Sequence, residues 1–115
     1  MSAVEQYARA HIVTDEAQDP PAVPVALRYD PEADPQQVHI MLPGHHEWVF
    51  ARDLLEQGLR APAAAGDVRI WPCGRVQAVM EFHSARGVAV VQFETKTLIR
   101  FLRRTYMATP VSSQS

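Results

Sequence analysis

The sequence is poor in the residues that mark disulfide-bonded, phosphate-binding and membrane proteins. Its single cysteine, Cys73, excludes an intrachain disulfide framework and leads us to expect a reducing, cytoplasmic setting. Its five glycines are scattered among turns and form no phosphate-binding loop. No apolar run is as long as a membrane span. Glu5 and Arg9 stand where a secretion signal needs apolar residues, so we expect no such signal.

Candidate catalytic and metal-binding residues are also few. His45 and His46 are neighbours in an expected turn and lack the spacing that binds zinc firmly, so a solvated turn is favoured. Arg52 and Asp53 are adjacent in an expected helix and therefore do not face each other. Cys73 has no recognisable base beside it in the sequence. We therefore expect no enzymatic activity, no metal and no cofactor.

The length and composition predict one globular domain. Of 115 residues, 47% are hydrophobic and 21% are charged, which is typical of a folded domain. We place this domain at residues 1–107 and expect a disordered C-terminal tail at 108–115. Alternating and β-branched patterns predict about seven strands, at residues 4–13, 25–29, 38–42, 47–50, 66–72, 76–84 and 87–95. Residues 14–24, which contain three prolines, and residues 61–66 are expected to form loops.

The stretch EWVFARDLLEQGL, residues 47–59, changes from a strand pattern to a helix pattern. We predict a helix from about Arg52, with Gly58 as a left-handed residue after its end and Leu59 packing back on Leu54. We interpret the stretch as a structural corner that joins two layers of the fold. The residues of this corner are Trp48, Phe50, Leu54, Leu55, Gly58 and Leu59.

A second helix is predicted from about Thr95 to Met107. Its apolar residues recur at helical spacing and are expected to face the core: Leu98, Phe101, Leu102 and Tyr106. Its basic residues lie away from that stripe: Lys96, Arg100, Arg103 and Arg104. Each half of the chain thus runs from strands into a helix, which predicts an α+β fold of two antiparallel sheet-and-helix halves.

Charge divides the chain into an acidic and a basic half. Residues 1–59 contain three Arg and ten acidic residues, whereas residues 60–115 contain seven Arg, one Lys and three acidic residues. The basic residues of the second helix are either a solvated face or a surface for phosphates, a membrane or an acidic protein. Single-strand nucleic-acid binding would also need exposed aromatic residues, and strand aromatics are more often part of the core. The aromatic candidates are Trp48, Trp71, Phe82 and Phe93.

Three stretches closely resemble conserved blocks of the SsgA-like proteins, which regulate sporulation and cell division in filamentous actinobacteria. They are VPVALRYDP at residues 23–31, EWVFARDLLEQGL at 47–59 and GDVRIWP at 66–72. In order and spacing, the similarity covers about residues 4–106.

The resemblance implies a non-enzymatic adaptor that acts at septation sites. It implies a homotrimer with a fold similar to whirly-type single-strand nucleic-acid-binding proteins. The implied partners are cell-division proteins, such as the tubulin-like FtsZ or another SsgA-like protein. Two functions remain open, a division adaptor and, as the alternative, a single-stranded nucleic-acid-binding protein.

Overall fold

The computed structural model describes residues 3–13, 22–44 and 46–109 of the chain. Four strands and a helix are followed by four strands and a second helix. The first set is β1 (Val4–Val13), β2 (Ala22–Tyr29), β3 (Gln37–Leu42), β4 (His46–Ala51) and α1 (Arg52–Gly58). The second set is β5 (Ala63–Ala65), β6 (Val68–Cys73), β7 (Gln77–Ser84), β8 (Gly87–Glu94) and α2 (Thr95–Ala108). The predicted α+β class is confirmed, and most of the predicted tail lies outside the described residues.

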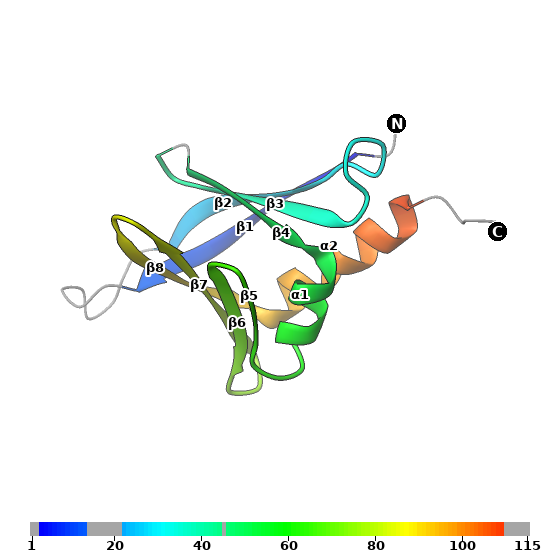
Figure 1. Cartoon of the computed structure of the whole chain (residues 1–115). Helices are drawn as coiled ribbons and strands as arrows, with labels where there is room; N and C mark the ends of the chain where they lie inside the picture. The colour runs from blue at the N-terminus through cyan, green and yellow to red at the C-terminus, as the bar shows by residue number, and fades with distance from the viewer. Residues whose placement is uncertain (1–2, 14–21, 45, 110–115) are drawn as a thin grey trace.

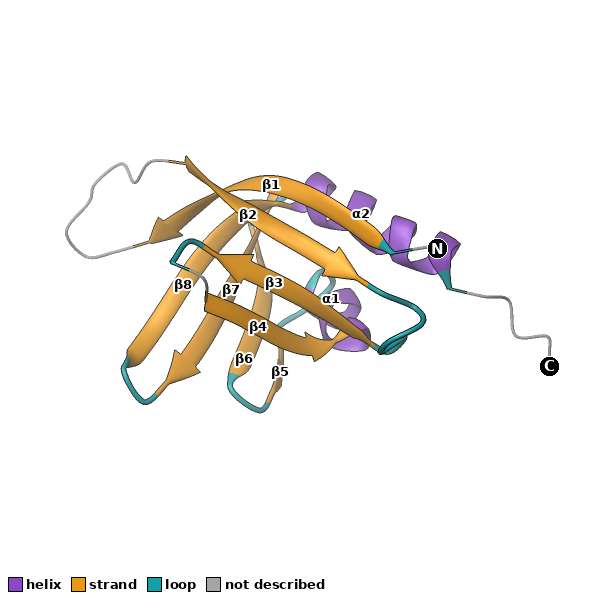
Figure 2. Cartoon of the chain, turned by 90° about the horizontal axis from the view of Figure 1, so that it is seen from above, coloured by secondary structure: helices purple, strands orange, loops and turns teal. Residues whose placement is uncertain are grey.

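All eight strands belong to one antiparallel sheet, in the order β4-β3-β2-β1-β8-β7-β6-β5 (Figure 2). The two halves predicted from the sequence therefore share a continuous sheet. The join is made by β1, which pairs with β2 over residues 4–11 and with β8 at residues 11–13. A ten-residue strand is long enough to have a different neighbour at its far end. Periodicity within a strand does not reveal this pairing, because register between distant strands is a tertiary property.

Two segments predicted as loops are strands. Residues 63–65 are three alanines, which have little intrinsic strand preference, yet they pair with Val68–Ile70 as β5. Their neighbour β6 supplies the ladder that their own sequence does not favour. The strand β2 begins at Ala22 and so includes Pro24. Pro24 lies beyond the Ala26–Arg28 pairing with β3, at an edge where a missing N–H is tolerated.

The core lies inside a curled sheet whose open side is covered by both helices (Figure 1). In β6, alternate residues point inward, and these include the predicted Val68 and Ile70. The helix α1 packs on β4, β5 and β6, and α2 packs on β1, β7 and β8. Curling also brings β4 toward β7, so that Trp48 stacks on Phe82 with ring centroids 4.9 Å apart.

The predicted end of the first helix is wrong at Gly58. This residue does not have a positive φ, but is the last residue of α1, and Leu59 follows it with φ −75°. The glycine is needed for another reason, because a Cβ there would lie 2.5 Å from Ile70 Cγ2 and 3.1 Å from the Ile70 carbonyl oxygen. A close approach of α1 to β6, rather than a left-handed turn, selects glycine here.

The apolar stripe of α2 differs from the prediction at one position. Leu98, Phe101 and Leu102 are buried, as expected, but Tyr106 is 44% exposed. Thr105 occupies the fourth buried position, and its hydroxyl donates to the carbonyl oxygen of Leu102. A threonine can be buried in a helix because this bond satisfies its only polar side-chain atom.

Candidate partner-binding surface

The outer face of α2 carries three exposed cations that have no counter-ion in the described part of the chain. They are Lys96, Arg100 and Arg103, and they make no ion pair or hydrogen bond to residues 3–13, 22–44 or 46–109. Hydrophobic side chains lie among them, with Ile99 37% exposed and Met107 84% exposed. We call these five residues the basic face of α2. An exposed helix face that mixes unpaired cations with apolar side chains is suited to contact a partner.

Arg104 differs from the other predicted cations. Its guanidinium donates to the carbonyl oxygen of Glu5 at 3.3 Å and to Gln6 Oε1 at 3.2 Å. These bonds attach α2 to the first residues of β1, so Arg104 has a structural contact within the chain. The structure thus separates Arg104 from Lys96, Arg100 and Arg103, which the sequence alone grouped together.

A shallow depression adjoins the first turn of α2. It has a volume of about 420 Å³ and lies between that turn and the β6–β7 connection. Val76, which is 70% exposed, and Ile99 provide apolar surface there, beside Arg75 and Lys96. The depression extends the basic face of α2 toward the sheet, and Glu94 lines it beside these cations and apolar side chains.

The predicted corner residues lie where β4 passes into α1. Phe50, Leu54 and Leu55 are buried in the core. Trp48 and Leu59 are partly buried and pack against it. Trp48 presents one ring face to Phe82 and lines a groove with the rest of its side chain.

Arg52 lies at the centre of this corner and holds three elements together. Its Nη1 donates to Thr109 Oγ1 at 2.8 Å and to the hydroxyl of Tyr29 at 3.3 Å. Its guanidinium carbon lies 4.0 Å from the ring centroid of Tyr106, within the range of a cation–π contact. The hydroxyl of Tyr106 donates to Glu56 Oε1, and this hydrogen bond raises the pKa of Tyr106.

These contacts give Arg52 a structural role that the sequence did not suggest. Tyr29 belongs to β2, Arg52 to α1 and Tyr106 to α2, and no short spacing connects them in the chain. The only indication is the position of an arginine immediately after an apolar strand. That position is ambiguous, because an arginine there is usually solvent-exposed.

His39 is the centre of a second polar cluster. Its Nε2 lies 2.7 Å from Asp34 Oδ2, and its Nδ1 lies 2.9 Å from Glu47 Oε2. Partial burial opposes the charge of His39, but the hydrogen bonds that His39 makes to the carboxylates of Asp34 and Glu47 outweigh it and raise the pKa of His39. A doubly protonated imidazole can donate to both carboxylates. This cluster therefore joins β3, β4 and the turn between β2 and β3 that contains Asp34.

The remaining candidates are dispersed. Cys73 is exposed at the end of β6, and His46 is exposed at the start of β4, while His45 lies outside the described residues. Within the part of the chain that the structure describes, no three His, Cys, Asp or Glu side chains are grouped to hold a metal ion. Neither of the two described helices is long and apolar enough to span a bilayer.

Comparison with known proteins relates this fold and surface to one family. The family model described as "Streptomyces sporulation and cell division protein, SsgA" matches residues 23–114. The chain is a member of the SsgA family. This family is named for sporulation and cell division.

Relatives called "Sporulation-specific cell division protein SsgB" are similar over most of this SsgA-family chain. The Salinispora tropica protein is 42% identical over 79% of this chain and 71% of its own length. The Streptomyces coelicolor protein is 40% identical over 90% of this chain and 78% of its own length. The resemblance noted in the three sequence blocks is thus confirmed as family membership.

Solved structures support the same assignment. A chain from a study of SsgB mutations and longitudinal cell division in Streptomyces coelicolor superposes with a TM-score of 0.84 and 38% identity. That match covers 94% of this chain and 87% of the other. An SsgA-like sporulation-specific cell division protein from Thermobifida fusca gives a TM-score of 0.74 at 27% identity, covering 94% and 82%. The curled eight-stranded sheet with two helices therefore belongs to this family.

Proposed function

We propose that this SsgA-family protein is a non-enzymatic adaptor of sporulation-specific cell division. Membership of a family whose relatives are named as sporulation-specific cell division proteins carries this proposal. The adaptor acts at septation sites in the cytoplasm, where it brings division machinery to the septum. Its partners are division proteins such as FtsZ, a protein that binds FtsZ, or another SsgA-like protein.

The basic face of α2 is the surface through which the adaptor contacts its partner. Its three cations are exposed and have no counter-ion in the described part of the chain, so an acidic partner gains their attraction without first breaking an ion pair. Charges of this kind add little to folding stability because water solvates them well. They raise the rate of encounter with a partner of opposite charge.

A pull-down from sporulating cells tests this proposal. The bait carries Arg100→Glu and Arg103→Glu, which reverse two charges of the basic face. The matched control carries Arg60→Glu and Arg69→Glu, whose side chains are 78% and 61% exposed outside α2. We expect the wild type and the control to capture division proteins and the α2 variant to lose them. Equal capture by all three baits would contradict the role of this face.

The alternative function is single-stranded nucleic-acid binding. The basic face favours it, but the aromatic side chains required for stacking on bases are less available. Of the four predicted aromatic candidates, Phe82 and Phe93 are buried in the core, and Trp48 and Trp71 are partly buried, with one ring face of Trp48 stacked on Phe82. Fluorescence anisotropy with labelled oligonucleotides distinguishes the two functions, because nucleic-acid affinity falls steeply as salt rises. Strong binding with a steep salt dependence would favour the alternative.

A further inference from the structure

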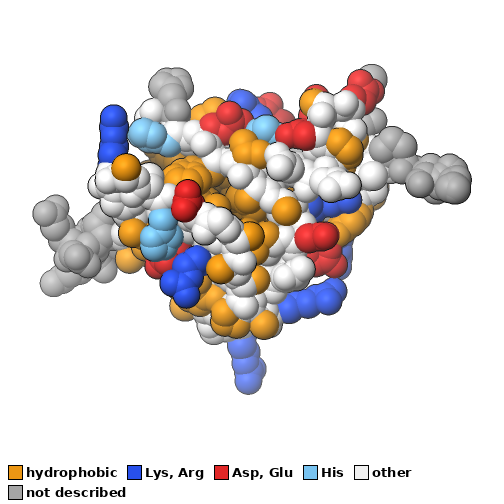
Figure 3. Space-filling view, viewed as in Figure 1, with side chains coloured by type: hydrophobic (Ala, Val, Ile, Leu, Met, Phe, Trp, Pro, Cys, Tyr) orange, Lys and Arg blue, Asp and Glu red, His pale blue; other side chains and the backbone are white. Residues whose placement is uncertain are grey.

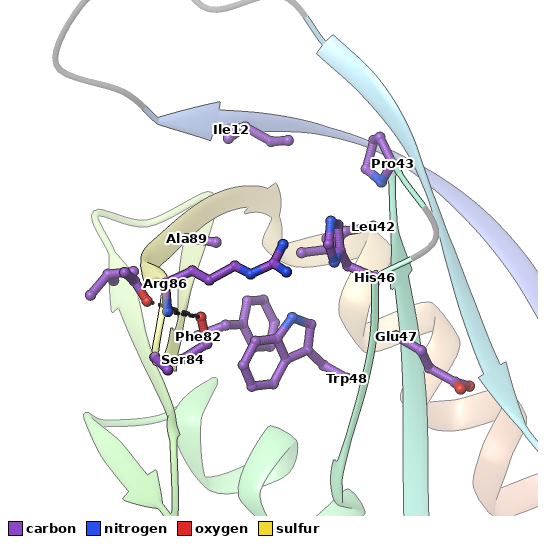
Figure 4. A pocket seen from close by; sticks show the side chains of 13 residues that line it. Ile12, Leu42, Pro43, His46, Glu47, Trp48, Phe82, Ser84, Arg86 and Ala89 are labelled. Carbon is purple, nitrogen blue, oxygen red and sulfur yellow. Dashed lines mark hydrogen bonds between the residues drawn. The ribbon is translucent and has the colours of Figure 1, made fainter.

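A groove opens at the end of the sheet that lies away from α1 and α2. It is bounded by the β3–β4 hairpin on one side and by the β7–β8 hairpin on the other, and it has a volume of about 770 Å³ (Figure 4). Its floor is the stacked pair of Trp48 and Phe82. Ile12 and Leu42 add further apolar surface. Figure 3 shows hydrophobic side chains gathered in a hollow on this side of the molecule.

One cation stands over this apolar floor. Arg86 extends from the β7–β8 turn across the groove toward His46 (Figure 4). The backbone N–H of Arg86 donates to Ser84 Oγ at 3.2 Å, which fixes the turn that carries it. Its guanidinium makes no hydrogen bond or ion pair to any residue that the structure describes. A carboxylate in the groove would find in Arg86 a planar donor suited to bidentate binding.

The groove also runs along a free strand edge. Among the residues that the structure describes, β4 is the terminal strand of the sheet and pairs only with β3. The backbone N–H of Arg52 donates to the carbonyl oxygen of Gln36 at 2.9 Å, in the same register as the β3–β4 ladder. Hydrogen-bonded and non-hydrogen-bonded residue pairs alternate along an antiparallel ladder. Counting back from Arg52 by twos, Phe50 and Trp48 therefore bond to β3, whereas the backbone groups of Glu47 and Val49 point to the open edge. Such an edge is a template for one more strand.

We propose that this groove binds an extended, acidic segment of a partner protein by strand addition to β4. The segment forms backbone hydrogen bonds with Glu47 and Val49, places an apolar side chain on Trp48 and pairs a carboxylate with Arg86. This site deepens the proposed adaptor function, on which its biological role rests. It provides a second contact, separate from the basic face of α2.

A protein segment fits these features better than a nucleic acid does. An open strand edge offers main-chain donors and acceptors at a repeat of about 3.3 Å per residue, which an extended peptide matches. In an extended peptide, side chains two residues apart point to the same face. If one of them is apolar and the other acidic, the apolar side chain covers Trp48 and the acidic one reaches Arg86. A single-stranded nucleic acid would need several cations along its backbone. Arg86 is the only Lys or Arg that lines the groove among the described residues.

Selection of short random peptides displayed on phage against the immobilised full chain tests the proposal. The best peptide is then labelled and titrated by fluorescence anisotropy. Three proteins are compared with the wild type: Arg86→Glu, Val49→Pro, and the double α2 variant Arg100→Glu with Arg103→Glu. Val49→Pro removes an N–H from the open edge, where proline is tolerated. As a test that leaves the protein unchanged, the peptide is also made with alternate amides N-methylated.

We expect the selected peptides to share an acidic residue two positions from a large apolar one. Arg86→Glu should weaken their binding at least about tenfold, and amide methylation should abolish it. The α2 variant should bind as the wild type does. In a Trp71→Phe background, peptide binding should change the fluorescence of Trp48, which is then the single tryptophan.

Several results would overturn the proposal. They are the enrichment of no peptide, equal binding by Arg86→Glu, or unchanged binding after amide methylation. If oligothymidylate binds the wild type and Arg86→Glu abolishes that binding, the groove is a nucleic-acid site instead. Failure of the proposed function is a different result, because a chain that binds these peptides but never reaches septa contradicts the adaptor role and leaves the site intact. A chain that reaches septa but enriches no peptide contradicts the peptide site in the groove and leaves the adaptor role intact.

Discussion

At the scale of single residues, Gly58 shows how packing can determine a residue's identity. A glycine inside a helix normally costs stability, so replacement by alanine would ordinarily stabilise the protein by about 0.5–1 kcal/mol. Here a Cβ would overlap Ile70. We expect Gly58→Ala to destabilise by about 1–3 kcal/mol, as overpacking does, and Gly58→Val by more. Urea unfolding measures this, with the exposed neighbour substitution Gln57→Ala as the control. A stabilised Gly58→Ala protein would contradict the close contact of α1 and β6.

His39 gives the protein a pH-dependent stability. Its pKa is raised in the folded state, with the hydrogen bonds of Asp34 and Glu47 outweighing the opposing effect of burial. A raised pKa means that the folded state binds the proton more tightly than the unfolded state does. This contribution is fully present below the unfolded value of about 6.5 and is lost as pH rises through the folded pKa.

The substitution His39→Gln should therefore flatten the decrease in stability as pH rises above about 6.5. Thermal unfolding measured across this range tests the prediction, and His46→Gln, an exposed histidine on the neighbouring strand, is the control. If His39→Gln retained the same pH dependence as the wild type, the His39 cluster would not be its source.

At the scale of elements, replacing Arg52 by lysine should lower the stability of the fold. The planar guanidinium bonds to Tyr29 and Thr109 while it lies over the ring of Tyr106. An ammonium cannot make these contacts together. We expect Arg52→Lys to lower the free energy of unfolding by about 1–2 kcal/mol, the range of a partly desolvated cation–π contact with its hydrogen bonds. Unfolding in urea of Arg52→Lys beside Arg60→Lys provides the comparison. Equal stability of the two variants would exclude the role assigned to this cluster.

The elements also show what the sequence could and could not predict. Strand alternation, the two helices and three of the four predicted residues of the buried stripe of α2 follow from local periodicity. The eighth strand was missed because three alanines form β5 only through their pairing with β6. The groove and the Arg52 cluster were missed for a similar reason. Trp48 meets Phe82, and Arg52 meets both Tyr29 and Tyr106, only after the sheet has curled.

At the scale of the whole molecule, the family resemblance and the division of charge between the two halves of the chain predict a homotrimer. Opposite charges on the two halves favour head-to-tail contact between copies. Light scattering at micromolar concentration should give about three times the chain mass of 12.9 kDa. The double variant Arg100→Glu with Arg103→Glu should give the same mass if the basic face of α2 is free for partners. A monomeric wild type would remove this assembly from the account.

We propose that the basic face of α2 connects this SsgA-family protein to the division machinery. Fluorescent fusions imaged in sporulating cells of its own host test this most directly. The wild type and the control with Arg60→Glu and Arg69→Glu should concentrate at septa. The variant with Arg100→Glu and Arg103→Glu should be equally abundant but diffuse. If that variant concentrates at septa as the wild type does, the basic face is not the contact with the division machinery.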